Sequence, residues 1–301
     1  LICNKYMTAA TLKAQGANKQ GQQRKQNPMF AKHNDTLNIR YGWDVIREGT
    51  PLIITLKQHG TSGRTGLVLD ELPTSWYTSY VQKALSWLGL ELKTQEWKHI
   101  TGTRNTVLAE LDQEDNLGKE SYRHEIHNRF KKLDMYPGEV FYYEIVGYGG
   151  GSPIMSRHGV DPKSKNEADK FIFKQYGQSI VYSYGQPQGT YEIYVYRITH
   201  VGTDGHTTEY SWDAVKSRCE QLGLKTVPEL ARLTKQANTL EQIKALTDGP
   251  DPLDPTHPRE GVCVRVDSPR HAIYKFKGWT FSYLEGITKD DEGYVDLEEA
   301  S

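Results

Sequence analysis

The strands that this sequence predicts come in hairpins, with helices between them at irregular intervals. The period-two run YEIYVYRITHV (191–201) is reversed by the turn GTDG into HTTEYSW (206–212), and a second pair of strands is predicted at 50–60 and 65–72. A doubly wound parallel sheet would alternate strands and helices regularly. The pattern therefore favours an α+β fold of mainly antiparallel sheets flanked by helices.

The other predicted elements follow the same mixed order. Strands are expected in 97–111 around the turn Thr101–Thr103 and at 138–148, 261–266 and 271–278, and helices at 73–90, 119–133, 212–224 and 239–248. A loop rich in Gly and Ser is expected between 149 and 190, and a proline-rich loop before Glu260.

Composition describes a soluble globular chain. Hydrophobic residues make up 37% and charged residues 25% of the 301 residues, and no apolar run approaches the roughly 20 residues of a membrane helix. The three cysteines Cys3, Cys219 and Cys263 are scattered and form no C-x-x-C pair. A disulfide framework is therefore not expected, and a reducing, cytoplasmic setting is.

The two ends of the chain have opposite charge, although the net charge is only −1. Residues 1–40 carry seven lysines and arginines against Asp35, which suits either phosphate contact or a solvated arm. We predict a basic, polar N-terminal segment (1–29), one large folded domain (30–287) and an acidic tail (288–301).

The stretch TLKQHGTSGRTG (55–66) places Lys57 at the end of an apolar strand, before small and glycine residues. Alone, this pattern fits an ordinary turn. Four later segments carry residues that would suit a shared site with Lys57. These residues are Glu144 on the strand FYYEIVGYG, Tyr194 and Tyr196 on one face of 191–201, Glu260 before GVCVRV, and Lys275 and Lys277 on one face of the last strand.

This ordered set resembles the covalent nucleotidyltransferase superfamily, which comprises DNA ligases, RNA ligases and mRNA capping enzymes. LKQHGTSGRTG and YGQPQGTYEIYVYRIT look most like the phage-type ATP-dependent RNA ligase family. The resemblance spans about Phe30 to Lys277, and the whole set is specific although no single member is. His59 replaces the aspartate of the commoner K-x-D-G motif, which favours the RNA branch.

The chemistry is coherent with these residue types. A lysine amine is a poor nucleophile while protonated, and nearby positive charges disfavour its ammonium form. Lys275, Lys277 and a metal ion would do this, and would neutralise an α-phosphate and leaving pyrophosphate. Glu260 offers a hard oxygen ligand for Mg²⁺, and a tyrosine face can stack on a base.

The resemblance implies a nucleotidyltransferase (ATP-grasp-like ligase adenylation) domain that seals RNA 5′-phosphate to 3′-hydroxyl ends. The implied cofactors are ATP and Mg²⁺, with Mn²⁺ as an alternative. RNA is the implied partner, with no membrane and no obligate protein partner. A bacterial virus or bacterium is the implied source, and the location is the cytoplasm, that of the host for a phage protein.

The resemblance also implies roles for individual residues. Lys57 would form the lysyl-AMP, Lys275 and Lys277 would contact the α-phosphate, and Glu260 would hold the metal ion and help bind the nucleotide. The remaining nucleotide-binding residues would be Leu56, His59 and Gly60 near the lysine, Arg64 and Arg104 on phosphate or ribose, Glu144 on the ribose hydroxyl, and Tyr196, or else Tyr194, on the base.

Each residue also has an ordinary structural reading. Glu260 could pair with Arg259 or Arg265, Lys275 and Lys277 could form an exposed strand face, the tyrosines could be half-buried sheet residues, and Glu144 could be an ion-pair partner. Arg64 lies seven residues after Lys57 rather than the usual five. HEIH (124–127) lacks the H-E-x-x-H spacing and is expected on the surface, and His158 in a mobile loop.

Three rival functions remain. A DNA ligase or capping enzyme generally carries an OB-fold after the last lysine motif, and only 24 residues follow Lys277 in this chain of 301, which favours RNA. An inactive nucleotide- or RNA-binding module would be expected to lack the nucleophile or the metal-binding acid, and both are present. The third rival is an unrelated α+β interaction protein whose motifs coincide by chance.

Overall fold

The computed structural model describes residues 27–33, 36–72, 81, 87, 94–108, 121–268 and 271–286. Most of the polar N-terminal segment, the acidic tail and nearly all of the predicted helix 73–90 lie outside these residues, so the proposed domain boundaries stay predictions. Within the described residues, no helix has the length and apolarity that a membrane span requires.

Five strands form sheet A. In spatial order they are β1 (Leu37–Asn38), β14 (Ala272–Lys277), β13 (Gly261–Val266), β2 (Pro51–Lys57) and β12 (Glu229–Thr234). All neighbours pair antiparallel except β1 and β14. The central strand β13 therefore brings two distant parts of the sequence, β2 and β14, to its two sides.

Sheet B is larger and is also mainly antiparallel. Its spatial order is β10 (Thr207–Glu209), β9 (Tyr191–Val201), β5 (Glu139–Gly149), β3 (Thr61–Glu71) and β4 (Gln95–Gly102), with β11 (Lys225–Thr226) on β9 and β6 (Ser152–Pro153) on β5. A separate two-stranded ribbon joins β7 (His158–Gly159) to β8 (Ser179–Ile180). The expected α+β fold of mainly antiparallel sheets is confirmed.

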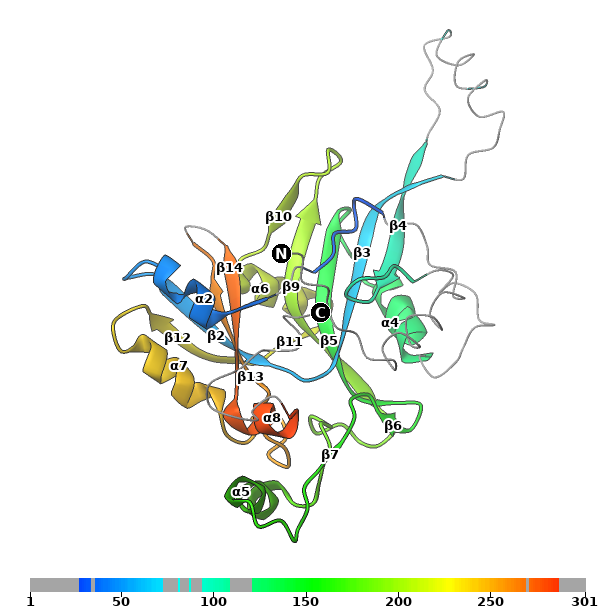
Figure 1. The fold of residues 1–301 in the computed structure, drawn as a ribbon. Helices are drawn as coiled ribbons and strands as arrows, with labels where there is room; N and C mark the ends of the chain where they lie inside the picture. Colours follow the sequence, from blue (N-terminus) through cyan, green and yellow to red (C-terminus); the bar gives the residue numbers. More distant parts are fainter. Residues whose placement is uncertain are drawn as a thin grey trace, which may run out of the picture.

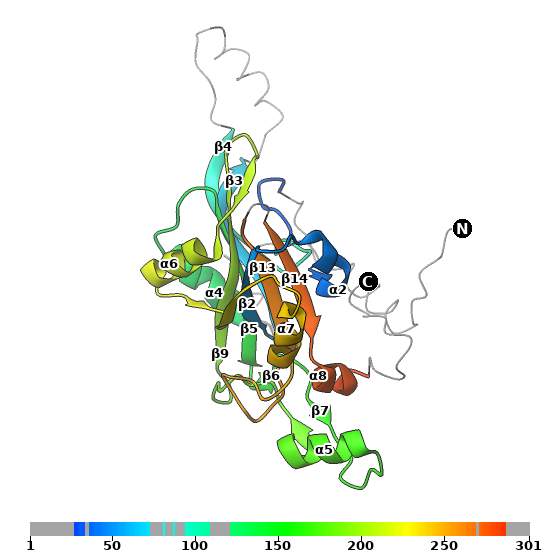
Figure 2. The same cartoon turned by 90° about the vertical axis from the view of Figure 1, so that its left-hand side faces the viewer.

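Helices cover the outer faces of the two sheets. Figure 2 shows α4 (Ser121–Lys131) and α6 (Trp212–Leu222) beside sheet B, and α2 (Ile39–Gly42) and α7 (Thr239–Thr247) beside sheet A. The helices η2 (Trp43–Val45), α5 (Glu167–Tyr176) and α8 (Trp279–Leu284) complete the described elements. This leaves the inner faces of the sheets to form a site between them.

Alternation along β13 decides which residues face inward. Val262 and Val264 are fully buried against Ile243 of α7, and each such burial contributes roughly 1.5–3 kcal/mol. Cys263 and Arg265 alternate with them and point to the other face, where they line a pocket. A one-residue slip would expose the valines, so burial fixes the register that points Arg265 inward.

The chain passes from sheet A to sheet B immediately after Lys57. β2 ends at Lys57 and β3 begins at Thr61, so three residues, Gln58–Gly60, join the sheets (Figure 1). Gly60 is required there, because a Cβ atom would lie 2.5 Å from the carbonyl oxygen of Ile145. The short connection holds Lys57 at the junction of the sheets.

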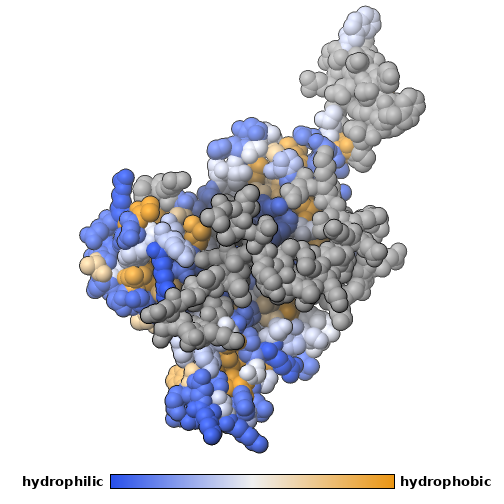
Figure 3. All heavy atoms as spheres, viewed as in Figure 1, coloured by the Kyte–Doolittle hydropathy of each residue, from blue (hydrophilic) through white to orange (hydrophobic). Residues whose placement is uncertain are grey.

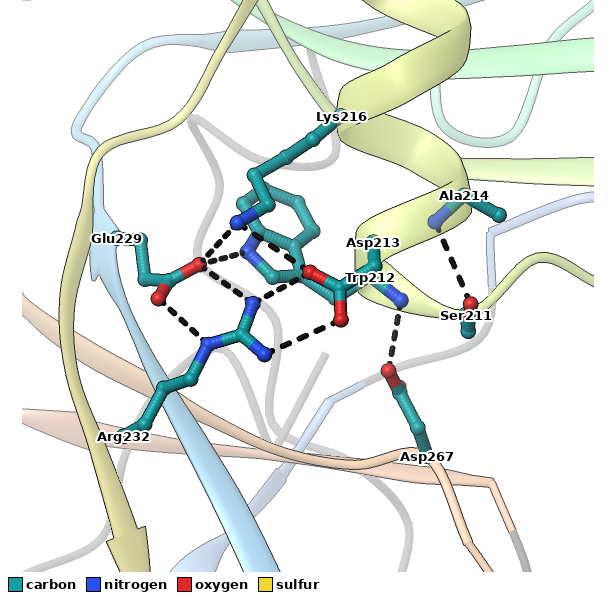
Figure 4. Close-up of polar contacts among 8 residues, drawn as sticks. All are labelled: Ser211, Trp212, Asp213, Ala214, Lys216, Glu229, Arg232 and Asp267. Carbon is teal, nitrogen blue, oxygen red and sulfur yellow. Dashed lines mark hydrogen bonds and ion pairs between the residues drawn. The ribbon is translucent and has the colours of Figure 1, made fainter.

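A polar cluster ties α6 to sheet A (Figure 4). The indole Nε1 of buried Trp212 donates to Glu229 of β12 at 2.8 Å, and its backbone N donates to Asp267 at 2.6 Å. Arg232 bridges Glu229 to Asp213. Exposed ion pairs contribute little, about 0–1 kcal/mol, so the buried indole is the stronger link between α6 and sheet A.

Most of the predicted elements in the described residues are present, with two corrections. The expected loop 149–190 contains α5, which Asn166 caps through a 2.8 Å bond to the backbone N of Ala168. The expected surface position of HEIH is wrong for His127, which is buried and whose Nδ1 lies 3.0 Å from Thr101 Oγ1.

Candidate active site

Lys57 meets Glu260 between the two sheets. Their Nζ and Oε1 atoms lie 2.5 Å apart, with side-chain exposures of 19% and 2%. Gly261 pairs with Lys57 across β2 and β13, and a Cβ on Gly261 would lie 2.1 Å from the carbonyl oxygen of Phe276. Only glycine fits this close approach, so the Glu260–Gly261 pair fixes the carboxylate beside the lysine.

Lys275 and Lys277 come from the strand on the other side of β13. Lys277 pairs with Gly261 and Lys275 with Cys263, so both lie on the face that carries Glu260 and Lys57. Lys277 Nζ is 3.9 Å from Glu260 Oε1, and both lysines are buried. The reading of these two lysines as an exposed strand face is therefore wrong.

A pocket lies between the two sheets, around these residues. Of the candidates from the sequence, nine line it: Leu56, Lys57, His59, Gly60, Arg104, Glu144, Tyr196, Glu260 and Lys275. They come from both sheets and their loops. Residues as far apart in sequence as Leu56 and Lys275 thus meet at one described cavity.

Glu144 and Tyr196 form the sheet B side of the pocket. Ser62 Oγ donates to Glu144 Oε2 at 3.2 Å. Tyr142 pairs with Arg197 and Tyr143 with Val195, so Tyr196 is the extra residue of a β-bulge. Burial raises the pKa of Tyr196, so its ring remains neutral near pH 7.

Arg104 lies at the tip of the turn after β4. The turn is closed by the Thr103 N–Thr106 O hydrogen bond of 2.8 Å, slightly later in the sequence than the predicted turn Thr101–Thr103. Although distant from Lys57 in sequence, Arg104 lines the pocket. The turn therefore delivers a cation to the cavity from the far edge of sheet B.

Three of the sequence candidates do not line the described pocket: Lys277, which lies beside Glu260, and Arg64 and Tyr194. Arg64 is buried, and its guanidinium donates to the carbonyl oxygens of Phe30 at 3.0 Å and Thr103 at 3.1 Å. Tyr194 is buried in the core, where Lys225 Nζ lies 5.9 Å from its ring centre. The geometry gives Arg64 and Tyr194 structural roles, so Tyr196 is the tyrosine placed to contact a ligand.

His59 lies between two carboxylates. Its Nδ1 is 3.9 Å from Glu260 Oε2, and its Nε2 is 3.8 Å from Glu285 Oε1. Its backbone N–H donates to the hydroxyl of Tyr184 at 2.5 Å. Burial is the main cause that lowers the pKa of His59, so the ring is neutral near pH 7. A neutral ring of fixed position can orient Glu260.

His158 supports this arrangement from β7 and does not lie in a mobile loop as expected. Its Nε2 is 2.9 Å from Glu285 Oε1, and its Nδ1 is 3.0 Å from the hydroxyl of Tyr182. Its ring stacks with that of His59 at 6.3 Å between centres. The chain Glu260–His59–Glu285–His158 thus links the ribbon and α8 to the lysine.

Among the pocket residues that the sequence analysis missed, Arg265, Gln58 and His33 have unusual surroundings. Arg265 Nη1 donates to the carbonyl oxygen of Tyr196 at 2.7 Å, and its Nε and Nη2 have no described hydrogen-bond partner. The amide atoms of buried Gln58 also have none. Burial, then the charges of Arg197 and others, lower the pKa of His33 to about 3. The alternation of β13 signals Arg265, whereas no sequence pattern signals His33.

These features describe what the pocket can do. Its cations, Lys57, Arg104, Arg265 and Lys275, exceed its carboxylates, Glu144 and Glu260, so it suits an anionic ligand. The orphaned buried donors on Gln58 and Arg265 suit a ligand with polar edges.

A metal ion would find few protein ligands here. No cluster of three or more His, Cys, Asp or Glu side chains occurs among the described residues. Mg²⁺ is often held by one or two carboxylates together with substrate phosphates and water. Glu260 fits this pattern, because it supplies one carboxylate in a pocket whose cations suit phosphates.

A family model described as RNA ligase matches residues 50–277. None of the curated proteins matches the sequence.

Among solved structures, a mutant of Naegleria gruberi RNA ligase with ATP and Mn aligns at 16% identity and a TM-score of 0.52, covering 89% of this chain and 62% of that one. An apo mutant of the same enzyme aligns at 17% identity and a TM-score of 0.53, covering 91% of this chain and 62% of that one. A mutant with AMP and Mn aligns at 17% identity and a TM-score of 0.52, covering 88% of this chain and 61% of that one. This chain thus spans about three fifths of their length, and the likeness shows a shared fold.

Proposed function

The chain belongs to the RNA ligase family, and from this membership we propose that it is an ATP-dependent RNA ligase whose nucleophile is Lys57. The observation that carries the proposal is the 2.5 Å contact between Lys57 and Glu260 inside a cationic pocket. The similar Naegleria gruberi structures with ATP or AMP and Mn support a nucleotide and a divalent cation as ligands here as well.

In the first step, the Nζ of Lys57 attacks the α-phosphorus of ATP. A P–N bond forms, the bond between the α-phosphorus and the bridging oxygen breaks, and pyrophosphate leaves. The amine must lose its proton first, and the ion pair with Glu260 opposes this loss. Nucleotide binding must therefore loosen the Lys57–Glu260 contact before attack.

Lys275 and Lys277 provide the positive charge that this step needs. Both project from β14 beside Glu260, and Lys275 lines the pocket. Their ammonium groups would neutralise the oxygens of the α-phosphate as negative charge builds up on them. They would also disfavour an additional positive charge on Lys57 once Glu260 no longer pairs with it.

The remaining pocket residues would bind the nucleoside. Tyr196 would stack on the base and Glu144 would accept a hydrogen bond from the ribose hydroxyl. Arg104 would contact phosphate or ribose, while Leu56, His59 and Gly60 bring the backbone after β2 close to the nucleotide. We withdraw Arg64 from this set, since its guanidinium is already bonded to two carbonyls.

Glu260 is the residue that would hold Mg²⁺ or Mn²⁺. The bound cation would supply charge neutralisation at the phosphates. Glu260 would then exchange its lysine partner for the cation, which fits the need to free the amine of Lys57.

The later steps would act on RNA. An oxygen of an RNA 5′-phosphate attacks the phosphorus of lysyl-AMP, the P–N bond breaks, and the amine of Lys57 is regenerated. An RNA 3′-hydroxyl then attacks the activated 5′-phosphate and displaces AMP. Since ATP and RNA are both available in the cytoplasm, we propose that location.

Two rivals on the same fold make different predictions. A DNA ligase or capping-type enzyme would also form a lysyl-nucleotide but would not join RNA ends. An inactive binding module would form no adduct, and the presence of Lys57, Glu260, Lys275 and Lys277 in one site argues against it.

Ligation of a 5′-phosphorylated RNA tests the proposal. With ATP and Mg²⁺, we expect an adenylated RNA intermediate and then a joined product, with much less product from a DNA of the same sequence. Joining of DNA alone would favour the DNA ligase rival. Absence of both intermediate and product from RNA and DNA would contradict the proposed activity.

A further inference from the structure

The segment between β6 and β9 projects from the body of the molecule as a small lobe. We call residues 156–180 the α5 lobe; it comprises β7, α5 and β8 and extends beyond the two sheets (Figures 1 and 2). Within α5 only Ile172 is fully buried, whereas Phe171 and Phe173 are 53% and 38% exposed. Two exposed aromatic rings on one helix suggest a binding surface.

The α5 lobe is also basic. Its exposed cations are Arg157, Lys163, Lys165, Lys170 and Lys174, against the acids Asp161, Glu167 and Asp169. Lys170 pairs with Glu167 at 2.7 Å, and the other four cations form no ion pair with a described residue. Hydrophilic side chains dominate this lobe in Figure 3. An excess of two cations is notable in a chain whose net charge is −1.

The α5 lobe adjoins the active site through α8, which begins two residues after Lys277. The Tyr283 hydroxyl of α8 donates to Asp169 of α5 at 3.0 Å. Trp279, 47% exposed, stacks on Tyr283 with 5.5 Å between ring centres and 24° between planes. His158 of the lobe contacts Glu285 at 2.9 Å. Exposed aromatic rings therefore continue from the lobe onto α8, next to the strand that carries Lys277.

We propose that the α5 lobe and the adjoining face of α8 dock a single-stranded stretch of the RNA substrate. Proteins that bind single strands combine cations that follow the phosphates with aromatic rings on which bases stack. The unpaired lysines of the lobe that carries Phe171, together with Trp279 on the adjoining α8, provide both features. That the strand is RNA rests on the proposed function.

Direct binding tests the lysines. For a 5′-phosphorylated single-stranded RNA of about 12 nucleotides, the variant Lys163→Ala/Lys165→Ala/Lys174→Ala should bind roughly tenfold more weakly near 0.1 M salt. Each lost phosphate contact should reduce the slope of log affinity against log salt by about 0.7, so the slope should become shallower by about 2. Formation of lysyl-AMP should be unchanged.

A matched variant removes the same charge elsewhere. Arg47→Ala/Lys132→Ala/Lys244→Ala changes three exposed cations outside the α5 lobe and should bind RNA as the unmodified protein does. Unchanged affinity in the lobe variant, or an equal loss in the matched variant, would overturn the docking proposal.

The aromatic contribution has its own control. Phe171→Ala should weaken RNA binding at least fivefold, whereas Phe171→Tyr, which keeps a stacking ring, should not. Equal affinities for both would remove stacking from the proposal. Because RNA binding is measured without catalysis, these results stand even if the protein forms no lysyl-AMP, an outcome that would instead contradict the proposed function.

Discussion

The Nζ of Lys57 and the Oε1 of Glu260 lie 2.5 Å apart, although 203 positions separate these residues in the sequence. Strand β13 creates this contact by pairing with both β2 and β14. The structure thus pairs the candidate nucleophile with a buried carboxylate. Release of this pair is the event that would activate Lys57.

Arg265 should control nucleotide affinity through Tyr196. Replacing it by methionine removes the 2.7 Å bond from Nη1 to the Tyr196 carbonyl oxygen and two orphaned buried donors in the pocket. We expect Arg265→Met to raise the ATP dissociation constant about tenfold, since a hydrogen bond from a charged donor contributes roughly 1.5–3 kcal/mol. Calorimetry would measure it. A lower melting temperature with unchanged ATP affinity would show that Arg265 only stabilises the fold.

Glu285 should make stability depend on acid. Its hydrogen bond with His158 is the main cause that lowers the pKa of Glu285 below its usual 4.5. A carboxyl group whose pKa is lower in the folded than in the unfolded state stabilises the fold at pH values above its unfolded-state pKa. This stabilisation is lost as the pH falls through the folded-state pKa. The melting temperature of Glu285→Gln should therefore fall less steeply below pH 4.5 than that of the unmodified protein. Identical curves would contradict this assignment.

Asp251 should have the opposite effect. It is 1% exposed, its Oδ2 has no described hydrogen-bond partner, and burial raises its pKa from 3.8 to about 6. A carboxyl group whose pKa is higher in the folded than in the unfolded state stabilises the fold at pH values below its unfolded-state pKa. For Asp251, this stabilisation is lost as the pH rises through about 6. Asp251→Asn avoids this loss, so it should be more stable than the unmodified protein at pH 7.5.

The size of that effect has an upper limit. A pKa of Asp251 that is about 2 higher in the folded than in the unfolded state corresponds to roughly 3 kcal/mol of stability, at 1.36 kcal/mol for each pH unit. Urea unfolding at pH 7.5 and pH 4 would measure it, with little difference between the proteins expected at pH 4. A stability difference that is equal at both pH values would show that ionisation of Asp251 is not the cause.

The residue types of the candidate site could be predicted from the sequence more accurately than the positions of those residues in the fold. Strand alternation correctly placed Lys275 and Lys277 on one face, because period two follows directly from strand geometry. It could not show that Tyr196 is the extra residue of a bulge, since bulges depend on pairing between strands. Tyr194 and Tyr196 therefore separate, and only Tyr196 lines the pocket.

Arginine positions show the same limit. Arg64 looked suitable because it follows the Lys57 loop, yet it is bonded to the carbonyls of Phe30 and Thr103. Arg104 reaches the pocket only because β3 pairs with β4, and Arg265 only because α7 covers the other face of β13. Such tertiary contacts are not encoded in local sequence patterns, and neither is the contact of His158 with Glu285.

Mass spectrometry of the intact protein after incubation with ATP and Mg²⁺ tests the central claim most directly. The protein is first stripped of bound nucleotide and compared with Lys57→Arg, which keeps the charge and the partner of Glu260. We predict an added mass of one AMP on Lys57, labile in acid and reversed by pyrophosphate, and no adduct on Lys57→Arg. An unmodified protein, or an equal adduct on the variant, would contradict the assignment of Lys57 as the nucleophile.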